Sequence, residues 1–178
     1  LPGVGQNLQD HLMVGVSYHS TQPITLANAD DKIEQEKFAY DRRGMKTSNY
    51  AEAGGFVKLN PESHAPELQF HFVPHINYPN DPNAHGFGVT PGIVTTKSIG
   101  YLELQSTDPN DPPLIDPNYL GDEHDMNVLV EGVKLSRKII HSSAFDKYRG
   151  EEYLPGADVV TDDDIKAFVE KSGIPYLP

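Results

Sequence analysis

The spacing of the apolar residues changes along the chain, and this change constrains the fold more than any other feature of the sequence. Before about residue 106, apolar positions recur every second residue, as in Leu12, Val14, Val16 and Tyr18, which is typical of a strand. From residue 122 onward they recur every third or fourth residue, which is typical of an amphipathic helix. Strands followed by helices predict an α+β domain, a largely antiparallel sheet with helices packed on one face.

Four strands are expected after the first one, which is centred on residues 12–18. In one of them Leu68, Phe70 and Phe72 share a face, so that Gln69 and His71 lie on the other. The remaining three are residues 52–59, 87–95 and 100–106. The last two are predicted to form a hairpin that turns around Lys97-Ser98-Ile99. Residues 1–10 are interpreted as a loop, and residues 108–117 as too rich in proline for regular structure.

Three helices are expected. Asp30 and Asp31 can cap the first, which runs to about residue 43 with Ile33, Phe38 and Tyr40 facing the core. Asp122 caps the second, whose apolar stripe consists of Met126, Leu129, Val130, Val133 and Ile140. The third begins with the capping box Thr161-x-x-Asp164 and ends at Gly173.

Length and charge exclude several classes of protein. A chain of 178 residues is long enough for one domain with a real core. With 26 acidic and 14 basic residues the net charge is −12, which argues against nucleic acid as a partner. The absence of cysteine excludes disulfides and thiolate metal sites. We see no signal peptide and no membrane span, and expect a cytoplasmic location.

Three segments, in this order, carry a resemblance to a known family. They are Leu1-Pro-Gly-Val-Gly-Gln-Asn-Leu-Gln-Asp-His11, then Pro66-Glu-Leu-Gln-Phe-His-Phe-Val-Pro74, then a longer stretch from Gly86 to Asp125 that includes Ser98-Ile-Gly-Tyr-Leu-Glu-Leu. Together they resemble the glucose–methanol–choline oxidoreductases, and the choline dehydrogenases among them most. The resemblance covers essentially the whole chain. It implies the substrate-binding part of an enzyme that oxidises a primary alcohol to an aldehyde by hydride transfer to FAD.

The resemblance also implies parts that this chain lacks. Family members bind FAD through G-x-G-x-x-G, but Gly3-Val4-Gly5 has no third glycine and no preceding strand. Their catalytic histidine is expected near positions 177–178, which hold Leu177 and Pro178. We therefore expect a fragment without a catalytic residue: residues 1–11 join it to a missing FAD-binding domain, and residues 12–178 form the substrate-binding domain. FAD is expected in the parent enzyme, and neither FAD nor activity in the fragment alone.

Two sets of site residues follow from the resemblance. Glu52 matches a glutamate that holds the trimethylammonium group in choline-oxidising members, and a carboxylate suits a quaternary cation. A solvated strand glutamate is the alternative. Asn7, Gln9, Asp10 and His11 match the junction segment and are expected near the flavin. Their alternative role is structural, with side chains bonding backbone amides in a tight turn.

His71 and Thr95 complete the expected substrate site. His71 and His75 are four residues apart, which on a strand separates them by ~13 Å. A metal site would also need His85 or Asp81, so His71 is interpreted as a pocket-wall residue and no metal is expected. Thr95 lies where some choline-oxidising members have a pocket histidine.

Two other functions remain open from the sequence. One is a stand-alone small-molecule-binding module of the same fold without redox activity, and the other is a histidine-based metal-binding protein. For the substrate-binding domain, the expected partners are a small alcohol and the missing FAD-binding domain. The apolar face that normally covers the flavin would also favour self-association.

Overall fold

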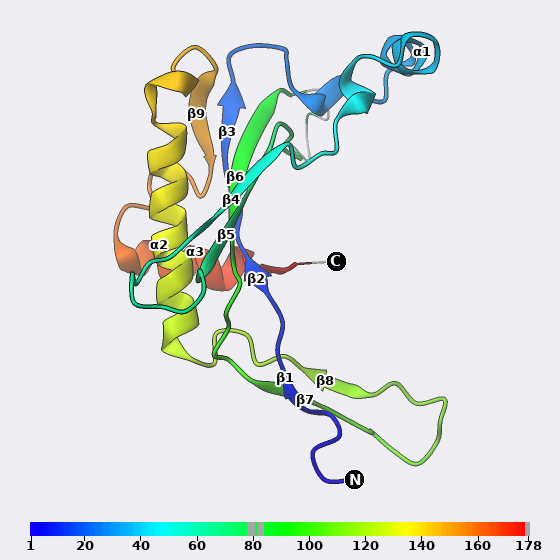
Figure 1. The fold of residues 1–178 in the computed structure, drawn as a ribbon, viewed down its shortest axis with the longest axis vertical. Coiled ribbons are helices and arrows are strands. Elements are labelled where there is room, and N and C mark those ends of the chain that lie inside the picture. The colour runs from blue at the N-terminus through cyan, green and yellow to red at the C-terminus, as the bar shows by residue number, and fades with distance from the viewer. Residues whose placement is uncertain (78–80, 82–83, 177–178) are drawn as a thin grey trace.

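A computed structural model describes residues 1–77, 81 and 84–176. It consists of a large antiparallel sheet with the long helix α2 packed along one face, and a small sheet that projects from one end (Figure 1). Figure 1 also shows a second projection, which carries α1 at the opposite end. The strands are β1 Gln6–Leu8, β2 Leu12–Met13, β3 Val16–Ser20, β4 Ala53–Val57, β5 Leu68–Val73, β6 Gly86–Ile93, β7 Gly100–Glu103, β8 Leu114–Asp116, β9 Arg149–Leu154 and β10 Ile174–Pro175. The helices are η1 Leu26–Asn28, α1 Lys32–Asp41, η2 Met45–Thr47, α2 Glu123–Ile140, η3 Ser143–Phe145 and α3 Asp162–Ser172.

The seven-stranded sheet is built around β6. This strand pairs with β2, β3 and β5, and β10, β9 and β4 extend the sheet from those strands. Every pairing in both sheets is antiparallel. The predicted α+β class, a largely antiparallel sheet with helices packed on it, is therefore confirmed.

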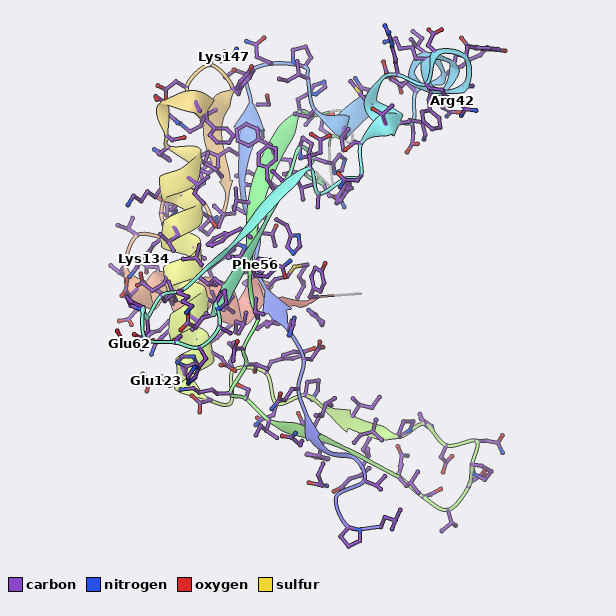
Figure 2. The ribbon with its side chains drawn as sticks, in the orientation of Figure 1. Arg42, Phe56, Glu62, Glu123, Lys134 and Lys147 are labelled. Atoms are coloured by element: carbon purple, nitrogen blue, oxygen red, sulfur yellow. The ribbon has the colours of Figure 1, made fainter. Side chains whose placement is uncertain are left out.

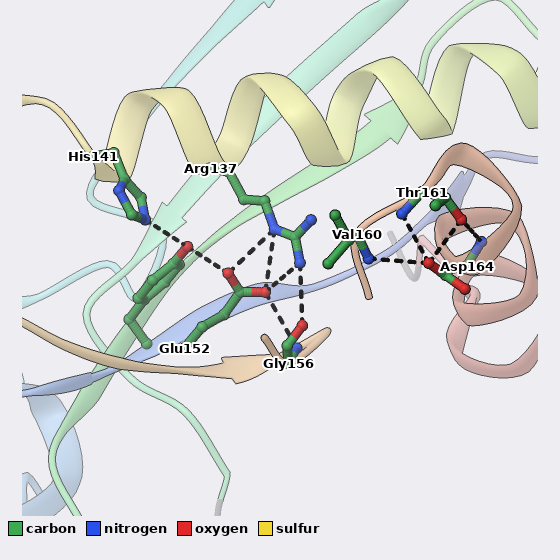
Figure 3. Close-up of polar contacts among 8 residues, drawn as sticks. Arg137, His141, Glu152, Gly156, Val160, Thr161 and Asp164 are labelled. Carbon is green, nitrogen blue, oxygen red and sulfur yellow. Dashed lines mark hydrogen bonds and ion pairs between the residues drawn. The ribbon is translucent and has the colours of Figure 1, made fainter. Parts of the chain in front are cut away.

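The apolar stripe of α2 packs on the sheet as the sequence predicts. Asp122 caps the helix by accepting a hydrogen bond from the His124 amide. The helix comes very close to β6 at Gly132, where an added Cβ would lie 2.8 Å from Pro91 Cβ. All five residues of the predicted stripe are buried: Met126, Leu129, Val130, Val133 and Ile140. The capping box of α3, formed by Thr161 and Asp164, is also present (Figure 3).

A half-buried ion pair joins α2 to β9. The Arg137 guanidinium donates to Glu152 Oε1 at 2.7 Å and to the Gly156 carbonyl at 3.2 Å (Figure 3). Tyr18 donates its hydroxyl to Glu152 Oε2 at 2.6 Å. Burial and the hydrogen bond to this carboxylate raise the pKa of Tyr18 well above its usual range. Because its charges and donors satisfy one another, we assign this cluster a structural role.

Three local predictions about strands are wrong, and the strand β9 was missed. Residues 1–10 contain β1, which pairs with β7 through Gln6 and Tyr101. The proline-rich segment contains β8, because its prolines flank the three paired residues and do not interrupt them. β7 pairs with β1 and β8, and does not form a hairpin with β6. The strand β9 was not predicted, because its sequence RGEEYL carries charge on an edge strand.

The predicted core face of α1 is also wrong. The helix forms at the expected place, but Ile33 is 67% exposed and Tyr40 is 83% exposed. Its one buried residue is Glu34, which accepts a hydrogen bond from the Met45 amide at 2.9 Å. The helix lies at the end of a projection, with Arg42 beside its tip (Figure 2), and has no core to pack against. In the described part of the chain, no helix is long and apolar enough to span a bilayer.

Candidate functional site

The face of the large sheet opposite α2 is open and contains a cavity of about 510 Å³. The strand register sets this face. Ser17 on β3 and Val73 on β5 both pair with Gly88 on β6, so these three residues lie in one row on one side of the sheet. The cavity is lined by Met13, Gly15, Val16, Ser17, Tyr50, Ala51, His71, Val73, His75, Ile76, Asn77, Gly88, Thr90, Tyr153, Leu154, Ile174 and Tyr176.

Two glycines line the middle of this face. Gly88 has no side chain to fill the position between Ser17 and Val73, and an added Cβ would lie 2.9 Å from the Val16 carbonyl oxygen. Gly15 also lines the cavity, and an added Cβ there would have no neighbour within 4 Å. Gly15 therefore leaves open space at the cavity, whereas Gly88 lets the backbones of β3 and β6 approach closely.

Aromatic rings form the walls of the cavity. The His71 and Tyr176 rings stack, with centroids 5.3 Å apart and planes 16° apart. The Tyr50 and His75 rings lie 5.9 Å apart. Tyr50 has a φ of 73°, which is uncommon for an aromatic residue and tends to occur at functional sites. An apolar, aromatic pocket with a few polar groups is typical of a small-molecule site.

Two buried polar atoms in the cavity wall have no hydrogen-bond partner. They are Ser17 Oγ and His75 Nδ1, and Ser17 is only 5% exposed. Leaving a buried donor or acceptor unsatisfied costs ~1–3 kcal/mol. Among the described residues, these are the buried side-chain polar atoms without a partner, and both belong to the same cavity.

Of the three predicted substrate-binding residues, the structure places His71 in this cavity. Glu52 precedes β4, is exposed, and borders two smaller hollows, one beside Phe72 and Phe145 and one beside Glu34. Thr95 follows the end of β6, is exposed, and donates to the Pro66 carbonyl at 3.3 Å. The structure therefore does not bring these three residues together.

The predicted junction residues connect the two sheets. Asp10 accepts hydrogen bonds from the His11 amide, at 2.8 Å, and from the Tyr119 hydroxyl. Burial and this bond to Asp10 raise the pKa of Tyr119 to about 12. Gln9 donates to Asn7 Oδ1 at 3.4 Å. These contacts are local ones of the kind that stabilise a turn.

One contact links the junction to the cavity. The His11 carbonyl accepts a hydrogen bond from the amide of Tyr176 at 2.7 Å, and Tyr176 is part of the cavity wall. The junction segment therefore holds one side of the cavity in place through its backbone.

The histidines do not form a metal centre in the described part of the chain, where no group of three or more potential ligands is present. His71 and His75 each face a tyrosine ring. His85 shares a hydrogen bond with Thr25 at 2.8 Å. Positions 177 and 178, where the family's histidine was expected, lie outside the described residues.

Most of the cavity was missed from the sequence. Ser17, Tyr50, Thr90 and Tyr176 come from separate segments, and pairing of the strands is what brings them together. Thr90 pairs with His71 and therefore faces the cavity. The alternation of side chains along β6 could have identified Thr90, in place of Thr95, as a cavity residue. No comparable signal was available for Tyr50, which lies between η2 and β4.

A family model and curated proteins match the sequence of this chain. A family model described as GMC oxidoreductase matches residues 96–177. The oxygen-dependent choline dehydrogenase of Ectopseudomonas mendocina (strain ymp) is 39% identical over 96% of this chain and 32% of its own length. That of Burkholderia cenocepacia (strain HI2424) is 40% identical over 95% of this chain and 31% of its own length. The chain thus spans about a third of the length of these curated relatives.

Solved structures show the same fold. Pyridoxine 4-oxidase from Mesorbium loti matches with a TM-score of 0.76 at 21% identity, over 98% of this chain and 32% of that one. Formate oxidase from Aspergillus oryzae RIB40 matches with a TM-score of 0.81 at 18% identity, over 97% of this chain and 36% of that one. The resemblance to the glucose–methanol–choline oxidoreductases is thereby confirmed.

Proposed function

We propose that this chain is the substrate-binding domain of an FAD-dependent alcohol oxidoreductase, and that the cavity on the open face of the large sheet holds the alcohol. The observation that carries the proposal is the position of the cavity. It lies on the face that α2 leaves open, and aromatic rings and two unpaired polar atoms line it. Residues 1–11 are the junction to the FAD-binding domain, and residues 12–178 are the substrate domain.

The FAD pyrophosphate must be bound by another part of the protein. Gly3 and Gly5 have positive φ values, and the Gly5 carbonyl accepts a hydrogen bond from Leu102, so this segment is a turn against β7. Residues 1–11 are instead proposed to contact the flavin ring, because a hydrogen bond between His11 and Tyr176 joins them to the cavity wall. Asp10 is occupied by its own hydrogen bonds, which leaves Asn7, Gln9 and His11 as the flavin-proximal side chains.

The residues of this chain bind and orient the substrate. Bound FAD supplies the redox chemistry by accepting a hydride from the alcohol carbon. The stacked rings of His71 and Tyr176 present a flat surface to the substrate, and the aromatic walls exclude water from it. Glu52 is kept as a proposed substrate contact, from the two smaller hollows that it borders beside the cavity. Thr95 is likewise kept as a proposed substrate contact outside the cavity, on the segment that follows β6.

The FAD-binding domain is proposed to cover the open face. The small sheet projects beside it with large apolar residues exposed, among them Tyr101, Leu102, Leu114 and Ile115. Exposed apolar groups of this kind favour association, so the chain alone is expected to self-associate.

The test uses the full-length protein that contains this chain. Its absorbance spectrum should include the flavin bands, and an alcohol substrate should bleach them under anaerobic conditions. His71→Ala should lower kcat/KM for that alcohol without loss of flavin. A full-length protein that lacks flavin, yet binds a small molecule in the cavity, would support the stand-alone binding module instead.

A further inference from the structure

The two unpaired atoms, Ser17 Oγ and His75 Nδ1, constrain the substrate class. Both line the same cavity, and no other part of the described chain satisfies them. A ligand can form a hydrogen bond to a buried polar group that has no partner, and no hydrogen bond within the protein has to break first. Ser17 pairs with Gly88 in the regular register between β3 and β6, so its side chain lies on the cavity side of the sheet.

Ser17 and His75 reach the cavity from different segments of the chain. Ser17 and Val73 flank Gly88 in one row across three strands, which separates them by roughly 10 Å. His75 lies two residues beyond Val73 along the chain. We infer that a ligand which pairs with both atoms carries two hydrogen-bonding groups, one for each segment.

The charge of the cavity favours an uncharged ligand. Its lining contains serine, threonine, asparagine, tyrosine and histidine, and no Asp, Glu, Lys or Arg among the residues that the structure describes. Glu52, the nearest candidate for binding a cation, borders other hollows. A quaternary ammonium group donates no strong hydrogen bond and accepts none, so an alcohol whose second group is of that kind would leave Ser17 or His75 unpaired.

We propose that the cavity selects an uncharged alcohol with a second hydrogen-bonding group, and that Ser17 and His75 recognise its two polar groups. This inference rests on the proposed function, because it takes the cavity to be the substrate site. It makes Ser17 and His75 determinants of specificity.

The experiment compares two alcohols of equal size with the full-length flavoprotein. Pentanediol with a hydroxyl at each end and n-hexanol differ only in a distal hydroxyl or methyl group. The wild-type protein should prefer the diol in kcat/KM by at least about 10-fold, because a site that bonds a hydroxyl rejects an analogue without one. Ser17→Ala should reduce this ratio by about 2- to 10-fold, the range for one neutral hydrogen bond. Ser20→Ala is the matched control, since Ser20 lies on the same strand and bonds Gln22 outside the cavity.

Folding and ligand recognition can be separated. The Ser17 hydroxyl has no partner in the protein, so Ser17→Ala should leave Tm unchanged or raise it. His75→Phe keeps a ring against Tyr50 and should also reduce the diol preference. Three results would overturn the inference in a protein that still oxidises alcohols. They are a lowered Tm for Ser17→Ala, an equal diol-to-hexanol ratio of kcat/KM in the wild type and both variants, and a wild-type preference for choline over the diol. If the protein holds no flavin or oxidises no alcohol, the proposed function fails and this inference fails with it.

Discussion

Filling the cavity at Gly15 should block substrate without harming the fold. Gly15 lines the cavity, its φ lies outside the left-handed region, and a Cβ added there has no neighbour within 4 Å. Replacing glycine at a compatible position stabilises a protein by about 0.4–1 kcal/mol, because the unfolded chain loses freedom. Gly15→Leu is therefore expected to fold with Tm at or slightly above the wild-type value.

The same side chain should overlap the substrate. A misfit of this kind in a packed space costs ~1–3 kcal/mol, which corresponds to about a 5- to 150-fold loss of kcat/KM. Gly55→Leu is the matched control, because an added Cβ at Gly55 also has no neighbour within 4 Å and Gly55 does not line the cavity.

The assay is steady-state oxidation of the alcohol by the full-length protein, with thermal unfolding followed in parallel. The reasoning predicts a loss of kcat/KM in Gly15→Leu alone, with both variants folded. Equal activity in the two variants would refute the assignment of the cavity as the substrate site.

Three further predictions concern the core, a buried carboxylate and Glu52. Leu129→Ala should lower the free energy of unfolding by ~2–5 kcal/mol, because Leu129 is fully buried, whereas Ile139→Ala on the exposed side of α2 should cost far less in the same denaturant titration. Burial alone would raise the pKa of Asp125, but hydrogen bonds from Ser98, Lys97 and Thr96 hold this pKa below its usual range. The carboxylate therefore stabilises the fold fully above its unfolded pKa, near 4. This stabilisation is lost as the pH falls through the pKa of the folded state. Asp125→Asn should cost ~1.5–3 kcal/mol at pH 7, and its deficit in Tm should shrink on acidification; a deficit that is constant with pH would contradict this. Glu52→Gln should raise KM if the substrate is a cation and leave it unchanged for a neutral alcohol, with Tm unaffected in either case, and a large loss of Tm would show a structural role instead.

The sequence predicted the parts of the fold that depend on local pattern. The stripe of α2, its cap at Asp122 and the capping box at Thr161 each depend on residues within a few turns of one another, and all three are present. The alternation in residues 68–73 likewise placed His71 on the correct face, away from the buried Leu68 and Phe70.

Features that depend on pairing between distant segments could not be predicted in this way. β7 was assigned to its neighbour β6, whereas its partners are β1 and β8. The exposure of Ile33 and Tyr40 on α1 was not predicted, because periodicity does not reveal whether a core lies beside a helix. The cavity depends on the register that brings Ser17 and Val73 to either side of Gly88, and neither composition nor a motif contains that register.

The most direct test of the central claim is a crystal structure of the full-length protein with its flavin and a bound substrate analogue. The account predicts that the flavin ring faces the open side of the large sheet and that the analogue lies in the cavity against His71 and Tyr176. A flavin on the side of α2, or an analogue bound away from the cavity, would contradict the account.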